Sequence, residues 1–202
     1  MKTLILGLIL LAAAGAARAA EAKPVWKWVT ANEYYLILPS AQSLHISGAG
    51  NESVRPWGFG FMAVGNETFS KAGGLQLRGV KVDSPAIGPK TFYMLDMLLG
   101  MHYMTPKAPG KPLRFKAGAF ADFGLSDTTL YMAPVIAAGL LYTTSETAET
   151  PNGFTFDITY RPTDIDLDNV GGGRSGALKP ALGFKVGYIF EGFWSVKNKI
   201  GT

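Results

Sequence analysis

The sequence contains no cysteine, only two histidines and no run of basic residues. The absence of cysteine excludes a disulfide-stapled scaffold and any thiol chemistry. Two histidines, His45 and His102, do not suffice for a histidine-based metal site. The formal charge of +4 is scattered along 202 residues without a basic stripe or a known motif, which gives no support for nucleic-acid binding. We therefore expect no metal, no cofactor and no nucleic-acid partner.

Long apolar runs are also scarce beyond the first residues. Lys2 is followed by an apolar run over 4–14 and by Ala17-Arg18-Ala19, a pattern typical of a secretory signal peptide, here residues 1–19. No later segment has the roughly 18–20 apolar residues of a membrane-spanning helix. The nearest approach, 130–142, is too short and contains Pro134. If such a chain spans a membrane, it must do so as a closed barrel, because in lipid only helices and closed barrels satisfy backbone polar groups.

What the sequence does have is alternation of apolar and polar side chains with a period of two residues. From Leu113 to Phe123 every second residue is apolar, while Arg114, Lys116 and Asp122 lie on the opposite face. Because the side chains of a strand alternate between its faces, this segment predicts a strand with one apolar and one polar side. Similar patterns predict eight strands: one within 26–38, and others at 57–65, 75–83, 91–104, 113–123, 129–143, 154–161 and 181–190.

The expected fold class is all-β, a single antiparallel up-and-down transmembrane β-barrel of eight strands with lipid outside and polar residues inside. The barrel would cover residues 20–190, followed by a C-terminal tail over 191–202. Pro134 counts against a sixth strand that is paired on both sides. A soluble secreted β-sandwich acting as a binding module is the alternative, since its strands alternate in the same way. External loops are expected at 39–56, 84–90, 124–128 and 162–180, and turns at the other end at 66–74, 105–112 and 144–153.

Charged and titratable residues fall on the predicted inner faces. An eight-stranded barrel is only wide enough to be filled by its own side chains. Enclosed charges must then be paired, because their desolvation costs several kcal/mol each. We interpret them as a salt-bridged plug, with a path for protons or ions as the alternative. They are Asp96, His102, Arg114, Lys116, Asp122, Asp157, Arg161 and Lys185.

The signal peptide, the aromatic-rich alternation and the segment Gly-Phe-Lys-Val-Gly-Tyr-Ile-Phe at 183–190 resemble small bacterial outer-membrane barrels, in the broad manner of the OmpA, OmpX and OmpW proteins. The resemblance implies residence in the bacterial outer membrane, contact with membrane lipid, and recognition by the outer-membrane assembly machinery of a closing aromatic residue, here Phe190. The chain departs from the pattern because residues 191–202 follow; Trp194 could instead belong to the closing strand. Interfacial aromatic belts are expected at Trp26, Trp57, Tyr93, Tyr103, Tyr142, Tyr160 and Tyr188.

The resemblance identifies no subfamily. Because a filled lumen argues against a wide aqueous pore, we expect a non-enzymatic protein that either is structural or, in a porin-like role, assists the passage of small apolar solutes, with a small apolar ligand as a partner.

An enzyme is the competing interpretation. His45 and Ser47 resemble the histidine–serine pair of the lipid A deacylases, which are also small outer-membrane barrels. The resemblance implies a general base and a nucleophile, with Glu52 as the local acid that orients the imidazole. In that family, however, the pair lies near the chain end and precedes asparagine, whereas here Gly48 follows. We commit to no catalytic residue.

Two further segments lie in the last expected external loop. The glycine-rich stretch 171–176 lacks the spacing of a phosphate-binding loop and is interpreted as a mobile external loop. Asp164, Asp166 and Asp168 alternate and are interpreted as a solvated acidic strand extension, with a weak cation site as the alternative.

Overall fold

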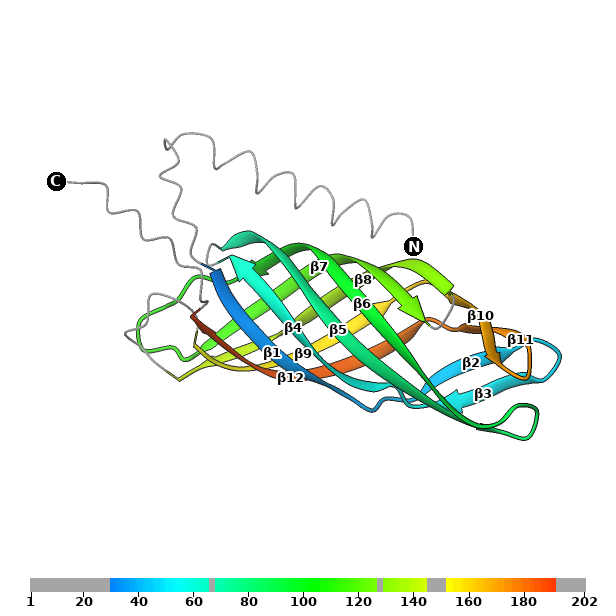
Figure 1. Ribbon diagram of the computed structural model, residues 1–202. Helices are drawn as coiled ribbons and strands as arrows, with labels where there is room; N and C mark the ends of the chain where they lie inside the picture. Colours follow the sequence, from blue (N-terminus) through cyan, green and yellow to red (C-terminus); the bar gives the residue numbers. More distant parts are fainter. Residues whose placement is uncertain (1–29, 66–67, 127–128, 145–151, 192–202) are drawn as a thin grey trace. The chain divides into compact units, whose positions relative to one another are not determined.

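The computed structural model describes residues 30–65, 68–126, 129–144 and 152–191, and every helix or strand assigned in these ranges is a β-strand (Figure 1). Eight of the strands close into an antiparallel barrel, in the order β1-β12-β9-β8-β7-β6-β5-β4. No helix in the described ranges is long and apolar enough to cross a membrane. The barrel strands are β1 (Thr30–Leu38), β4 (Trp57–Gly65), β5 (Phe69–Ser84), β6 (Gly88–Met104), β7 (Leu113–Ser126), β8 (Thr129–Thr143), β9 (Gly153–Arg161) and β12 (Ala181–Glu191).

The closed barrel confirms the predicted fold class and excludes the β-sandwich alternative. Each predicted strand corresponds to one barrel strand, and the chain meanders between neighbours as expected. The predicted signal peptide, most of the predicted tail, and Trp26 and Trp194 lie outside the described residues.

A second, four-stranded sheet was not predicted. It consists of β2 (Gln42–Ile46), β3 (Gly50–Val54), β10 (Ile165–Gly171) and β11 (Arg174–Leu178), in the order β10-β11-β2-β3. The expected loops 39–56 and 162–180 were therefore wrong, because each contains a hairpin. Both hairpins leave the barrel at the end opposite to the start of β1 and the end of β12, here called the distal end (Figure 1).

β5 and β6 are longer than predicted. They pair continuously from Ser84↔Gly88 to Phe69↔Tyr103. Most of the expected turn 66–74 is therefore strand, and the loop expected at 84–90 shrinks to the few residues between the two strands. Glycines interrupt the alternation of apolar and polar side chains in β5. At Gly74 a glycine is required, because a Cβ there would overlap the backbone of β4. The absence of a side chain lets the two strands approach at that point.

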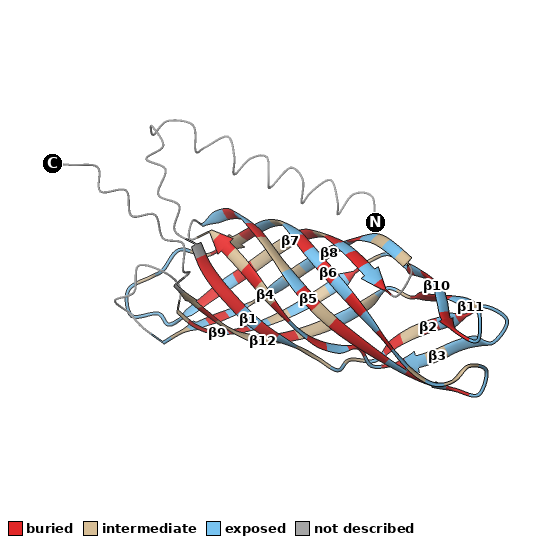
Figure 2. Cartoon of the chain, viewed as in Figure 1, coloured by how far each residue is buried: buried red, intermediate tan, exposed pale blue. Residues whose placement is uncertain are grey.

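Outward and inward side chains differ as a lipid-spanning barrel requires (Figure 2). Outward-facing Leu, Phe, Tyr and Met side chains are exposed on all eight barrel strands. At the end where β1 begins and β12 ends, aromatic rings pair on this surface: Phe154 and Tyr188 meet edge to face at 5.0 Å, and Tyr34 stacks on Phe190 at 5.6 Å. Trp57 and Tyr93 are both paired with Gly79 at the other end of the apolar band.

β8 is paired on only one side over half its length. It pairs with β7 from Thr129 to Tyr142, but with β9 only from Ile136 to Thr143. Residues 129–135 thus have no β9 partner, and we call this segment the open edge. Pro134 lies within it and pairs with β7 alone, which is the edge position where a strand tolerates proline. The Asp168 N–H of β10 donates to Thr129 Oγ1 at 2.8 Å and keeps β10 beside this edge.

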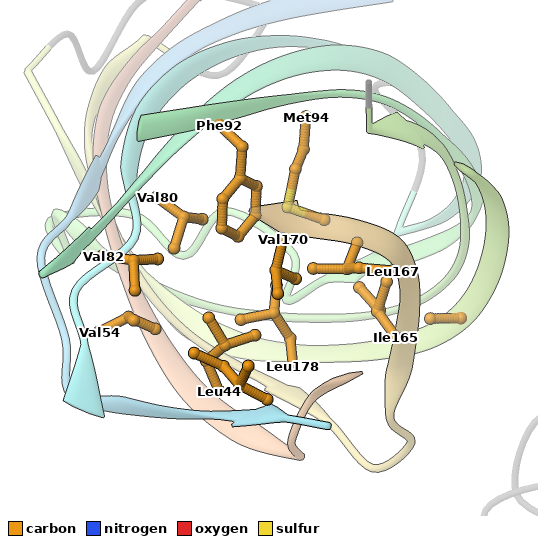
Figure 3. Packing of buried hydrophobic residues seen from close by; sticks show 12 residues of the cluster. Leu44, Val54, Val80, Val82, Phe92, Met94, Ile165, Leu167, Val170 and Leu178 are labelled. Atoms are coloured by element: carbon orange, nitrogen blue, oxygen red, sulfur yellow. The ribbon is translucent and has the colours of Figure 1, made fainter. Parts of the chain in front are cut away.

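The distal interior of the barrel is apolar, whereas a polar lumen had been expected throughout. The inner face of the second sheet packs against inward side chains of β5 and β6 (Figure 3). Fully burying a leucine or phenylalanine stabilises a protein by about 1.5–3 kcal/mol, so this core holds the second sheet on the barrel. The side chains labelled in Figure 3 are Leu44, Val54, Val80, Val82, Phe92, Met94, Ile165, Leu167, Val170 and Leu178.

We expect Pro134→Ala to leave the free energy of unfolding within about 0.5 kcal/mol of wild type, because position 134 has no partner on the β9 side. Ala138→Pro is the matched variant on the same strand, where Ala138 is paired with both Ala117 and Ile158. It should destabilise the barrel by at least about 1–3 kcal/mol through a lost ladder hydrogen bond. Urea unfolding in lipid vesicles measures both; equal losses would contradict the open edge.

Candidate functional site

One ion-pair cluster lies in the lumen below the distal core. Arg78 of β5 binds Asp96 of β6 in bidentate fashion, with Nε–Oδ2 at 2.6 Å and Nη2–Oδ1 at 3.0 Å. The same Nη2 donates to Asp122 Oδ2 at 3.3 Å. Gln76 Nε2 donates to Asp96 Oδ2 at 3.0 Å, and the Tyr131 hydroxyl donates to Asp96 Oδ1. One guanidinium and its neutral neighbours thus bind two carboxylates, of which Asp96 is 0% exposed. Asp122 Oδ1 has no hydrogen-bond partner among the described residues.

A second cluster lies closer to the end where β1 begins. Lys116 Nζ of β7 donates to Glu33 of β1 at 2.9 and 3.0 Å, and to Asp157 Oδ2 of β9 at 3.1 Å. The Thr155 hydroxyl donates to Glu33 Oε1 at 2.5 Å. This cluster again has one cation and two carboxylates, and it joins strands from opposite sides of the barrel.

Lys185 lies between the two clusters. Its Nζ donates to Gln76 Oε1 at 3.2 Å and lies 4.2 Å from the centroid of the Tyr35 ring. The Tyr35 hydroxyl donates to the same Gln76 oxygen at 3.2 Å. Among the described residues Lys185 has no carboxylate within ion-pair distance, so its buried ammonium is held by an amide and an aromatic face.

Two arginines bind backbone carbonyl groups near the ends of the lumen. Arg114 Nε donates to Thr105 O at 2.7 Å. At the distal end Arg161 donates to Thr163 O at 3.1 Å and to Lys179 O at 2.8 Å, which ties β9 to the connections of the second sheet. These arginines fasten the loops rather than pair with the luminal carboxylates.

The structure places the predicted inner residues Asp96, His102, Arg114, Lys116, Asp122, Arg161 and Lys185 in buried positions, and Asp157 in a half-buried one. Sequence reasoning did not include Glu33 and Arg78, the key partners of the two clusters. Glu33 lies in a stretch whose alternation is irregular. Arg78 directly precedes Gly79, where the apolar residues of the sequence move from odd-numbered to even-numbered positions. The available signal was that Gln76 and Arg78 alternate with Leu75 and Leu77, which places both polar residues on one face of the strand.

The three residues weighed as catalytic have separate partners. His45 and Ser47 both lie on the exposed side of β2 and the turn after it. His45 Nδ1 is 2.9 Å from Asn51 Oδ1, whereas Ser47 Oγ is 2.9 Å from Ser175 Oγ. Glu52 accepts a hydrogen bond from Ser84 at 2.6 Å. The hydrogen bonds of the described residues therefore do not connect the three into a triad.

The two segments of the last external connection form the β10–β11 hairpin. Gly172 and Gly173 have φ values of +59° and +71°, which turn the chain, and the expected loop continues as strand from Arg174. Asp166 and Asp168 lie on the exposed face of β10. Asp164 pairs with Lys179 at 2.7 Å. The described residues contain no group of three or more His, Asp or Glu side chains arranged to hold a metal ion.

An apolar groove of about 560 Å³ lies on the outer surface of β5–β8, next to the open edge. Leu130 and Met132 of that edge are 79% and 69% exposed. Gly124 and Tyr131 also line the groove, and a Cβ at position 124 would overlap the Tyr131 ring. The volume lies within the range of about 300–1,000 Å³ that is typical of small-molecule sites. The other lining residues include Leu75, Leu95, Met97 and Phe123.

We expect Arg78→Met to destabilise the barrel by about 3–5 kcal/mol, because it leaves Asp96 and Asp122 buried without their cation. Lys179→Met is the matched control: its pair with Asp164 is 38% and 41% exposed, and such pairs contribute about 0–1 kcal/mol. Urea unfolding midpoints of the two variants in lipid vesicles measure the difference. A similar small loss in both would show that the luminal cluster does not stabilise the barrel.

The same architecture occurs in known proteins. No protein-family model and no curated protein matches the chain. Among solved structures, the outer membrane protein AlkL, studied by solid-state NMR in DMPC lipid bilayers, matches with a TM-score of 0.52 and 13% identity over 88% of this chain and 97% of AlkL. The likeness to AlkL shows that the chain has the fold of an outer-membrane β-barrel. The resemblance inferred from the sequence is confirmed at the level of fold.

Two further solved structures match with lower TM-scores. The outer membrane protein OprG from Pseudomonas aeruginosa has a TM-score of 0.48 and 13% identity, over 82% of this chain and 98% of its own. The attachment invasion locus protein Ail of Yersinia pestis has a TM-score of 0.43 and 12% identity, over 82% of this chain and 100% of its own.

Proposed function

We propose that this protein resides in the bacterial outer membrane, with the distal end outside the cell, and assists the passage of small apolar solutes into the bilayer. The observation that carries the proposal is the open edge of β8, which lies between an apolar interior and an apolar outer groove. Membrane lipid is then the surrounding partner, and Phe190 on the closing strand is the residue that the outer-membrane assembly machinery would recognise.

A solute cannot follow the barrel axis, because charged clusters fill the lumen below the distal core. Arg78 with its two carboxylates, and Lys116 with its two, occupy successive levels of the interior. An apolar molecule gains nothing by entering such a region and would have to displace hydrogen bonds to charged groups, each contributing about 1.5–3 kcal/mol. The lumen therefore favours exit through the wall above the clusters.

The open edge is a place in the wall where a solute would break few hydrogen bonds. Between most strands a solute would have to break ladder hydrogen bonds, whereas the open edge has no β9 partner over residues 129–135. Of the inward side chains there, Ala133 and Val135 are small and apolar, whereas Thr129 and Tyr131 carry hydroxyl groups. Ala133 belongs to the distal core, and the Tyr131 ring packs against it. On the outside, Leu130 and Met132 line the groove. Apolar side chains thus lie on both sides of the open edge, and the Tyr131 ring contacts both the distal core and the groove.

The passage requires β10 to move away from β8, and a disulfide can prevent that movement. The chain has no cysteine of its own, so Thr129→Cys with Asp168→Cys creates a single pair where the two strands meet, at the hydrogen bond of 2.8 Å from the Asp168 backbone N–H to Thr129 Oγ1. Uptake of the apolar dye 1-N-phenylnaphthylamine into vesicles with a lipopolysaccharide outer leaflet, which excludes the dye in the absence of protein, should fall several-fold when this pair is oxidised and recover with dithiothreitol.

The matched control is Ser47→Cys with Ser175→Cys, which ties β2 to β11 within the second sheet, at hydroxyls 2.9 Å apart. It adds a disulfide at the same end of the barrel but leaves the open edge unchanged, so dye uptake should equal that of wild type. Full uptake with the β8–β10 disulfide formed, as verified by gel mobility without reductant, would refute this route.

A further inference from the structure

The second sheet has two outer strands, and each lies beside a barrel strand without pairing with it. β10 lies beside the open edge of β8, which is the exit proposed above. β3 lies beside the distal part of β5, and in the described ranges it pairs with β2 alone. We call the boundary between β3 and residues 80–84 of β5 the β3–β5 seam.

The backbone of β5 is free on the side of the β3–β5 seam. β4 pairs with β5 only as far as Trp57↔Gly79, whereas β6 pairs with β5 up to Ser84. Within the part of the chain that the structure describes, residues 80–84 thus pair with β6 alone. The β3–β5 seam therefore resembles the open edge, because in both places two strands meet without ladder hydrogen bonds.

Side chains hold the β3–β5 seam together. Ser84 Oγ of β5 donates to Glu52 Oε1 of β3 at 2.6 Å, and Ser84 is 1% exposed. Val54 of β3 and Val82 of β5 both belong to the distal core (Figure 3). Separating β3 from β5 therefore breaks a hydrogen bond between side chains and uncovers apolar surface, but it leaves the strand pairs of both sheets intact.

The β3–β5 seam lies beyond the apolar band of the outer surface. Gly79 is paired with Trp57 and Tyr93, which mark the end of that band. Residues 80–84 lie further toward the distal end. Their outward side chains include Lys81 and Asp83, which are both exposed. Charged outward residues are expected where a barrel wall contacts water rather than lipid.

The open edge lies within the apolar band. Leu130 of this edge pairs with Leu125 of β7, and Leu125 pairs with Leu95 of β6. Leu95 lies two residues from Tyr93, on the side toward the middle of the band. All three leucines are exposed on the outer surface. In a membrane whose hydrocarbon region matches the apolar band, the β3–β5 seam thus faces water and the open edge faces lipid.

The tip of the distal end is covered by two turns that pack together. Gly171 at the end of β10 has a φ of +139° and lies against the turn between β5 and β6. A Cβ at this position would lie 3.2 Å from the Ile87 Cβ and 3.4 Å from the Lys90 Cδ. Ile87 also packs against the distal core. A solute that approached from the tip would therefore have to displace these side chains.

We propose that the β3–β5 seam is the entrance by which an apolar solute passes from water into the distal core, and that the hydrogen bond between Glu52 and Ser84 keeps it closed. The inference rests on the proposed function and adds the first half of its route: the solute enters beyond the apolar band and leaves through the open edge into lipid. Because only residues 55 and 56 connect β3 to β4, the seam opens from the Glu52–Ser84 end.

A reversible cross-link tests the entrance. Because the chain lacks cysteine, Glu52→Cys with Ser84→Cys places two thiols across the seam, and 1,2-ethanediyl bismethanethiosulfonate joins them through a short bridge. Uptake of 1-N-phenylnaphthylamine into the lipopolysaccharide vesicles used above should fall several-fold and recover with dithiothreitol. Ser43→Cys with Ser53→Cys is the matched control, because these residues are paired within the second sheet; the same reagent should leave its uptake unchanged.

The two locks distinguish the entrance from the proposed function. Full uptake with the β3–β5 cross-link formed, as verified by mass spectrometry, overturns the entrance. If the β8–β10 disulfide still blocks uptake in that case, the proposed function stands without this entrance. If neither lock lowers uptake, both are refuted.

Weakening the β3–β5 seam should have the opposite effect. Glu52→Ala removes the acceptor of the Ser84 hydroxyl, so we expect dye uptake to become several-fold faster. Glu52→Gln is the matched control, since its amide oxygen can still accept that hydrogen bond, and its uptake should stay close to wild type. Wild-type uptake in Glu52→Ala, or an equal rise in Glu52→Gln, would contradict the closure by this hydrogen bond.

Discussion

An eight-stranded barrel leaves no room for bulk water, so each inward charge needs a counter-charge or hydrogen-bond partners within the protein. This constraint organises the interior of the protein. Arg78 joins β5 to β6 and β7, and Lys116 joins β7 to β1 and β9. The second set connects strands that are not neighbours, so it acts as a strut across the lumen in addition to the backbone ladder.

The same constraint explains why the barrel interior has two parts. Where the strands β5 and β6 extend past the clusters, their inward residues change from Gln76 and Arg78 to Val80 and Val82. These apolar residues have no lipid to face and are covered by the second sheet. Paired charges thus fill one part of the barrel interior, and apolar side chains fill the other. Tyr131 lies at the boundary between them, with its hydroxyl donating to Asp96.

The sequence predicted the barrel well where alternation is uninterrupted, as in 91–104 and 113–123. It predicted β5 poorly because Gly73, Gly74 and Gly79 carry no side chain to mark a face. The second sheet was taken for loops because its strands are short and their outer faces hold Asp, Ser, His and Asn residues. The partners within the lumen could not be read from the sequence at all, since they depend on how far each strand is shifted along its neighbours in the closed barrel.

The second sheet has a consequence for how the molecule assembles. β2 directly follows the first barrel strand, and β11 directly precedes the last one. When β11 pairs with β2, residues such as Ser47 and Ser175, 128 positions apart, come into contact. This is the same pair of chain ends that the β1–β12 seam brings together. The second sheet can form only when β2 and β11 are both available, so its completion is a long-range step in folding that needs nearly the whole chain.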